Sequence, residues 1–99
     1  MELEQLRMFV STAESGSFSA AGRELYTSHS TVSRAVSALE KELGVRLISR
    51  SNRVLGLTAA GELLLEEARE LLGKADGLGE KLRSLEGQEA RSRTGRNIL

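Results

Sequence analysis

Apolar and polar residues alternate with a helical period at the start of the chain. Between Leu3 and Ser15 the apolar side chains recur every three or four positions, and mostly charged residues fill the opposite side. Gly16 follows this stretch, as glycine commonly does where a helix ends. The pattern therefore predicts a helix over Leu3–Ser15 with one face in the core.

Two further helical stretches follow, and each begins at a serine whose hydroxyl can cap a helix. Ser17 precedes a predicted helix over 18–25, and Ser28 precedes a longer helix that Gly44 ends. A three-residue connection, 26–28, joins the two. The residues expected to face inward are Phe18, Ala20, Ala21 and Leu25 in the first of these helices, and Val32, Ala35, Val36, Leu39 and Leu43 in the second.

After Gly44 the pattern changes to short runs that contain β-branched residues. The runs 45–50 and 54–57 flank the segment 51–53, whose Ser, Asn and Arg favour a turn. We expect a two-stranded hairpin, or wing, to follow the third helix.

A long helix is predicted from Ala59 to about Gly87, with Thr58 as its cap. Leucines and alanines recur in it alternately four and three residues apart, which is the spacing of a coiled-coil seam. Burying a leucine contributes about 1.5–3 kcal/mol, whereas each interior glycine costs a helix about 0.8–1 kcal/mol. The seam therefore predicts a partner helix, most simply from a second copy of the chain. Its residues are Leu64, Ala68, Leu71, Ala75, Leu78, Leu82 and Leu85.

The composition limits the classes of function. The chain has 99 residues and no cysteine, so thiolate nucleophiles, disulfides and zinc–thiolate sites are excluded. No apolar run approaches the roughly 20 residues of a membrane span, and the first residues lack the features of a secretion signal. We expect a soluble, cytoplasmic protein that does not enter a membrane.

Positive charge is local rather than global. Lysine plus arginine and aspartate plus glutamate each number 14, so the formal net charge is zero. Between Ser28 and Thr58, however, five basic residues face only two acidic ones. A nucleic-acid binder needs such a cluster where it meets phosphate, so this segment is the candidate interface.

Two helices joined by a short connection, the second beginning with small polar residues, are typical of a helix-turn-helix. Short hydroxyl side chains fit a major groove, and His29 and Arg34 can donate to base acceptors. Arg50 and Arg53, at the expected wing tip, could reach the backbone or a minor groove. A solvated polar helix face is the plainer alternative for the hydroxyl run. The candidate contacts on the helix and its connection are Thr27, Ser28, His29, Ser30, Thr31, Ser33, Arg34 and Ser37.

An ordered set of residues runs along most of the chain: Leu6-Arg7-x-Phe9-Val10, Gly16-Ser17-Phe18-Ser19-x-Ala21, Val32-Ser33-Arg34, Leu39-Glu40-x-Glu42-Leu43-Gly44-Val45-x-Leu47, Arg50 and Leu57-Thr58-x-x-Gly61. This set resembles the amino-terminal domain of LysR-type transcriptional regulators. The resemblance implies a mostly α fold in which a winged helix-turn-helix, over 1–58, is followed by a dimerising linker helix, over 59–87. It also implies binding of a dimer to a dyad-symmetric promoter site in double-stranded DNA, with a tetramer possible for a full-length chain.

The chain departs from the family pattern in three places. His29 and Ser30 stand where the family usually has glutamine and proline, so the target sequence cannot be transferred from relatives. Ile48 replaces a usual phenylalanine before the wing. The polar tail, 88–99, resembles the hinge to the family's effector domain, which would make the chain either a truncated or a naturally short member.

Other classes of function are weaker. Ser28 and His29 are adjacent but lack an acidic residue close by in the chain, so no catalytic triad is indicated. His29 is the only histidine, which excludes a two-histidine metal site, and no cofactor is expected. A module that pairs with a full-length regulator through the seam, and a different winged-helix family, remain the alternatives to a DNA-binding homodimer.

Overall fold

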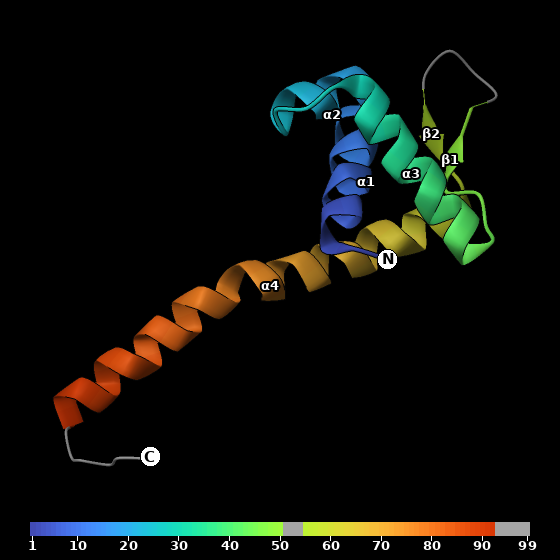
Figure 1. Cartoon of the computed structure of the whole chain (residues 1–99). Helices are drawn as coiled ribbons and strands as arrows, with labels where there is room; N and C mark the ends of the chain where they lie inside the picture. Colours follow the sequence, from blue (N-terminus) through green and yellow to red (C-terminus); the bar gives the residue numbers. More distant parts are fainter. Residues whose placement is uncertain (51–54, 93–99) are drawn as a thin grey trace.

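The computed structural model describes residues 1–50 and 55–92, with side chains described as far as residue 87. Three helices form a compact body, a short antiparallel sheet lies beside the third helix, and a long fourth helix extends away from the body (Figure 1). The elements are α1 (Leu3–Ser15), α2 (Phe18–Glu24), α3 (His29–Leu43), β1 (Ile48–Ser49), β2 (Gly56–Leu57) and α4 (Ala59–Ser92).

The predicted helix boundaries in the first half are confirmed, because local chemistry sets them. Gly16 and Gly44 follow α1 and α3 in the left-handed conformation, with φ of 79° and 72°. The hydroxyl oxygen of Ser17 accepts the backbone N–H of Ala20 at 2.9 Å, which caps α2. These signals lie within a few residues of each boundary, so sequence alone could identify them.

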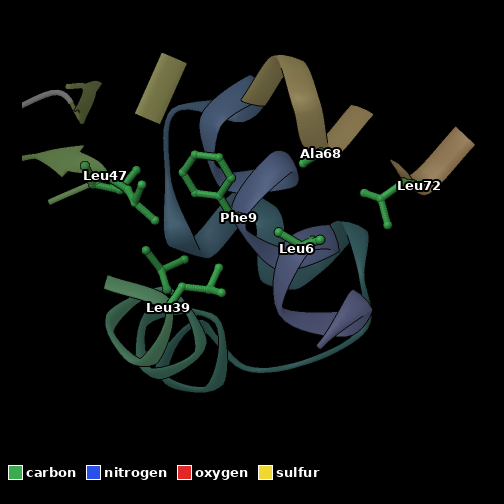
Figure 2. Packing of buried hydrophobic residues seen from close by; sticks show 8 residues of the cluster. Leu6, Phe9, Leu39, Leu47, Ala68 and Leu72 are labelled. Atoms are coloured by element: carbon green, nitrogen blue, oxygen red, sulfur yellow. The ribbon is translucent and has the colours of Figure 1, made fainter. Parts of the chain in front are cut away.

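The core lies where α1 meets α3, the sheet and the first turns of α4. Phe9 of α1 is fully buried at its centre (Figure 2). Leu39 comes from α3 and Leu47 from the segment before β1, so the wing is tied into the same cluster. Ile48 is also buried, which shows that the residue standing in for the family's phenylalanine is a core residue.

One inward residue of α3 was wrongly predicted. Leu43 is 39% exposed, whereas Glu40 is only 8% exposed. Glu40 lies one helical turn after the buried Val36, so it shares the inner face. Leu43 belongs to the last turn, just before Gly44 ends the helix.

The structure also corrects the start of the predicted coiled-coil seam. Ala68 is fully buried in the core of its own chain, so it cannot face a partner as predicted. Leu64 is partly buried against the same cluster, so its predicted contact with a partner is not tested. Leu72, outside the predicted seam, is the buried leucine, and its neighbour Leu71 is exposed. The remaining seam leucines, Leu78, Leu82 and Leu85, are exposed.

Ion pairs reinforce the docking of α4 on α1. The guanidinium of Arg7 lies 2.8 Å from the carboxylate of Asp76, and Arg69 lies 2.9 Å from Glu14. The hydrogen bond from Arg7 lowers the pKa of Asp76, and the same contact raises the pKa of Arg7. All four side chains are partly exposed, so the apolar contact supplies the attachment and these pairs orient the helix.

The fourth helix is longer than predicted. It continues to Ser92 rather than ending near Gly87, so part of the expected polar tail is helical. Residues 88–91 are Gln, Glu, Ala and Arg, which all favour helices, so the helix continues through Gly87.

Gly61 allows the first turn of α4 to approach the wing closely. A Cβ atom at this position would lie 2.1 Å from the carbonyl oxygen of Leu47. We expect Gly61→Ala to lower the free energy of unfolding by about 1–3 kcal/mol, because the backbone must shift. Gly73→Ala is the matched control, since its Cβ would meet nothing within 4 Å; it should raise stability by roughly 0.5–1 kcal/mol. Urea unfolding at one protein concentration measures both, and equal stability of Gly61→Ala and wild type would contradict the close approach.

Candidate nucleic-acid interface

The outer face of α3 carries small polar and basic side chains. Its inner face holds Val32, Val36 and Leu39 in the core, which fixes the rotation of the helix. The predicted contacts therefore lie on the opposite side or at its edges. Ser28, His29, Ser30, Arg34 and Ser37 are exposed, and Thr27, Thr31 and Ser33 are half-buried.

The first turn of α3 is held in place by its own side chains. The hydroxyl oxygen of Ser28 accepts the backbone N–H of Thr31 at 3.1 Å, and the two hydroxyl oxygens lie 2.9 Å apart. This cap satisfies one of the amides at the helix N-terminus. The remaining amides and the exposed His29 and Ser30 form a rigid, polar leading end.

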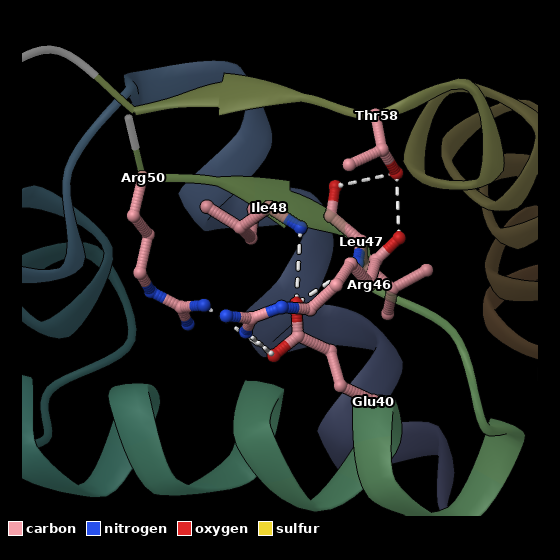
Figure 3. Close-up of polar contacts among 6 residues, drawn as sticks. All are labelled: Glu40, Arg46, Leu47, Ile48, Arg50 and Thr58. Carbon is pink, nitrogen blue, oxygen red and sulfur yellow. Dashed lines mark hydrogen bonds and ion pairs between the residues drawn. The ribbon is translucent and has the colours of Figure 1, made fainter. Parts of the chain in front are cut away.

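The wing is attached to α3 by a buried carboxylate. One oxygen of Glu40, Oε2, accepts the backbone N–H groups of Leu47 at 2.8 Å and Ile48 at 3.1 Å (Figure 3). The other, Oε1, lies 3.5 Å from the guanidinium nitrogens of both Arg46 and Arg50. A buried charge that receives four such partners is well compensated.

These contacts decide the charge state of Glu40. Burial raises the pKa of its carboxyl, but the N–H groups of Leu47 and Ile48 and the charges of Arg50 and Arg46 lower it by more. The net pKa lies below the ordinary value of a glutamate. Glu40 is therefore ionised at neutral pH.

Arg50 lies at the base of the wing rather than at its tip. Its guanidinium contacts Glu40 and stands 5.8 Å from the centre of the Phe18 ring. Arg46 shares the carboxylate but has a side chain that is 69% exposed. Arg53 falls within 51–54, outside the described residues, so its predicted place is not tested.

Glu40 and Arg46 belong to the site although the sequence pattern did not predict them there. Glu40 could have been found from its spacing of four residues from Val36, which places it on the inner face of α3. Arg46 gave no such signal, because only the folded loop brings it beside the helix. Together with Ser37 and Lys41 it lines an open hollow along α3.

The pattern of helices, wing and long helix is shared with known proteins. The family model for bacterial regulatory helix-turn-helix proteins of the lysR family matches residues 3–62. The chain belongs to the LysR family. Its long helix and two-stranded wing match the DNA-binding domains of solved LysR-type structures, so the expected fold is confirmed.

Two relatives show how much of a regulator the chain covers. It is 43% identical over 84 residues to the HTH-type transcriptional regulator TcbR of Pseudomonas sp. (strain P51), and 49% identical over 72 residues to the regulator ClcR of Pseudomonas putida. These matches take in 85% and 73% of the LysR-type chain but only 29% and 24% of the relatives. Both relatives are transcriptional regulators.

Solved structures of LysR-type domains align along most of the chain. The CbnR DNA-binding domain in complex with DNA has a TM-score of 0.80 at 42% identity, over 86% of this chain and 98% of that one. The BenM DNA-binding domain with benA site 1 DNA has a TM-score of 0.82 at 33% identity, over 86% of this chain and 96% of that one.

Within residues 1–50 and 55–92 no helix is long and apolar enough to cross a membrane.

Removing the charge of Glu40 tests its role in holding the wing. We expect Glu40→Gln to lower the free energy of unfolding by about 1–3 kcal/mol at neutral pH, because the buried amides and arginines lose their ionised acceptor. The pKa of Glu40 is lowered by folding, so its contribution is complete above the pKa of the unfolded chain and is lost as pH falls through the folded pKa.

The difference between wild type and Glu40→Gln should therefore shrink as the pH is lowered from about 7 to about 3. Urea unfolding across this range measures the effect. Glu80→Gln is the matched control, because Glu80 is highly exposed and pairs only with Arg83 among its described contacts. A difference independent of pH, or one that Glu80→Gln reproduces, would contradict the anchoring role.

Proposed function

We propose that the chain binds double-stranded DNA sequence-specifically as a dimer, with α3 in the major groove and the wing on the backbone or minor groove. The observation that carries this proposal is the outer face of α3. It presents His29 and Arg34 among short hydroxyl side chains, in a domain 42% identical to the CbnR domain solved with DNA. A helix of this composition fits a major groove without steric obstruction.

Different residues would bind the phosphate backbone, which positions the helix on the DNA, and contact the bases, which determines the sequence that is recognised. The N-terminal amides of α3 and the hydroxyls of Ser28 and Ser30 are suited to phosphate oxygens. Arg34 is exposed on the next turn and can donate two hydrogen bonds to guanine. His29 can donate to a base acceptor from the leading turn. The departures from the family at His29 and Ser30 would then give this chain its own target sequence.

Positive charge near α3 supports the backbone contact. Arg46 and Lys41 lie along the helix, and the negative charge of Glu40 is already compensated by backbone amides and by Arg50. Arg53 remains the proposed contact at the wing tip. A positive surface confined to this side is consistent with a zero net charge for the whole chain.

Dimerisation would use the distal part of α4. The exposed seam leucines of α4 are each about half exposed; Leu71 lies beside the part of the helix that docks on the body, and Leu78, Leu82 and Leu85 lie beyond it. Ala75, half-buried, lies between them in the same spacing. Covering such a stripe requires a second helix, and two copies would present two α3 helices to a dyad-symmetric promoter site.

The proposal is tested by titrating the protein against duplex DNA over a salt series. We expect saturable binding whose affinity falls steeply with salt, because bound Lys and Arg release counterions from phosphate. A module that acts only by pairing with another regulator would show little affinity and no salt dependence.

Arginine substitutions separate base reading from phosphate contact. Arg34→Ala should weaken binding to a preferred site by about 1–3 kcal/mol and leave binding to unrelated duplex nearly unchanged. Arg53→Ala should weaken binding to both and reduce the salt slope by about 1. Fluorescence anisotropy measures both quantities. Equal losses on both DNAs for Arg34→Ala would remove it from base reading, and an unchanged slope for Arg53→Ala would refute the wing contact.

Charged residues in the exposed seam should separate the protomers. We expect Leu71→Glu combined with Leu78→Glu to give a monomer that keeps its helical content, because both side chains are exposed in the single chain. Leu63→Glu is the control, since Leu63 is 60% exposed and lies outside the seam. Sedimentation equilibrium reads the mass, and a double variant that remains dimeric would overturn the seam.

A further inference from the structure

The end of α2 differs from the ends of the other two helices in the body. All three helices are followed by a residue in the left-handed conformation, and for α1 and α3 this residue is glycine. After α2 it is Tyr26, with φ of 58°. Among the described residues, Tyr26 is the only one other than glycine with a positive φ.

The backbone around Tyr26 has the hydrogen bonds of a standard helix ending. The N–H of Thr27 donates to the carbonyl of Gly22 at 2.8 Å, and the N–H of Tyr26 donates to the carbonyl of Arg23 at 3.4 Å. This is a Schellman motif, in which glycine is preferred and asparagine is the usual substitute at the left-handed position. A tyrosine there strains the backbone, because its Cβ approaches the following carbonyl.

The fold does not compensate this strain. The side chain of Tyr26 is 95% exposed, so its ring contributes almost no packing. The other aromatic residues, Phe9 and Phe18, both pack in the core clusters. An aromatic side chain that costs stability and buries nothing points to a contact outside the chain.

The position of Tyr26 indicates which contact this is. Thr27 and Ser28 follow directly, and Ser28 caps α3, so Tyr26 lies two residues before the cap of the helix proposed to enter DNA. The connection between α2 and α3 lies on the edge of the body from which α3 begins (Figure 1). The turn is also tight, because a Cβ at Gly22 would lie 2.7 Å from the carbonyl oxygen of Thr27.

The neighbouring charges favour an anion. Arg23 is exposed in the last turn of α2, three residues before Tyr26. The nearby carboxylate of Glu24 is directed to α1, where it accepts a hydrogen bond from the hydroxyl of Ser11. A phenol O–H and a guanidinium are both donors that proteins use on DNA phosphate oxygens.

We propose that Tyr26 and Arg23 form a phosphate-backbone contact that flanks α3 on the side away from the wing. The proposal rests on the DNA binding proposed above and adds a third point of attachment. With the wing on one side and this turn on the other, the backbone would be held on both sides of the helix. Such contacts fix the register of the helix on the duplex without reading sequence.

Three variants separate this role from a structural one. Tyr26→Asn keeps a residue that tolerates the left-handed conformation, so its Tm should rise while its affinity for duplex DNA falls. Tyr26→Phe keeps the ring and the strain, and it should lose affinity roughly 3- to 10-fold without a change in salt slope, because a neutral donor is lost. Arg23→Gln should reduce the salt slope by about 1.

Arg83→Gln is the matched control, because it removes the same charge from the distal part of α4; its salt slope should equal that of wild type. Tyr26→Phe and Tyr26→Asn variants that bind DNA as wild type does, while Arg34→Ala is weakened, would overturn this contact alone. A wild-type chain that binds no duplex would overturn the proposed function together with it.

Discussion

The carboxylate of Glu40 lies where α3, the wing and the start of α4 meet. It accepts the N–H of Leu47, and the carbonyl oxygen of Leu47 in turn accepts the N–H of Thr58 at 3.1 Å, just before α4 begins. Leu47 thus connects Glu40, on the inner face of α3, to the start of the long helix. Because a buried carboxylate is tolerated only with its full set of partners, this arrangement favours one relative position of the three elements.

The relative position of these elements matters because α3 is proposed to contact DNA while α4, remote from it in sequence, is proposed to form the dimer. The body presents α3, and α4 carries the exposed leucines outward from it. A twofold DNA reader needs a fixed distance and angle between its two α3 helices. Ala68 and Leu72 dock in the core, which ties the direction of α4 to the body at the point where the proposed partner-facing stripe begins.

The sequence predicted what local chemistry determines. Gly16, Ser17, Ser28 and Gly44 act on their own segments, so the helix boundaries beside them could be read directly. The prediction from sequence was wrong where a residue could pack against either of two helices. The leucine and alanine spacing in α4 is continuous, and only contact with α1 shows that Ala68 is used inside the chain. The helical period of α3 places Glu40 on the inner face, but the pattern does not reveal its partners, because the backbone amides of Leu47 and Ile48 come from a later segment.

Two copies of the chain are proposed to read one duplex through their two α3 helices. Selection of binding sites from random duplex DNA by the wild-type protein tests it most directly. We expect enriched sequences that contain two inverted half-sites at a fixed spacing, since the twofold symmetry of the protein is mirrored in its site. Enrichment of single, unpaired half-sites, or of no sequence at all, would contradict it.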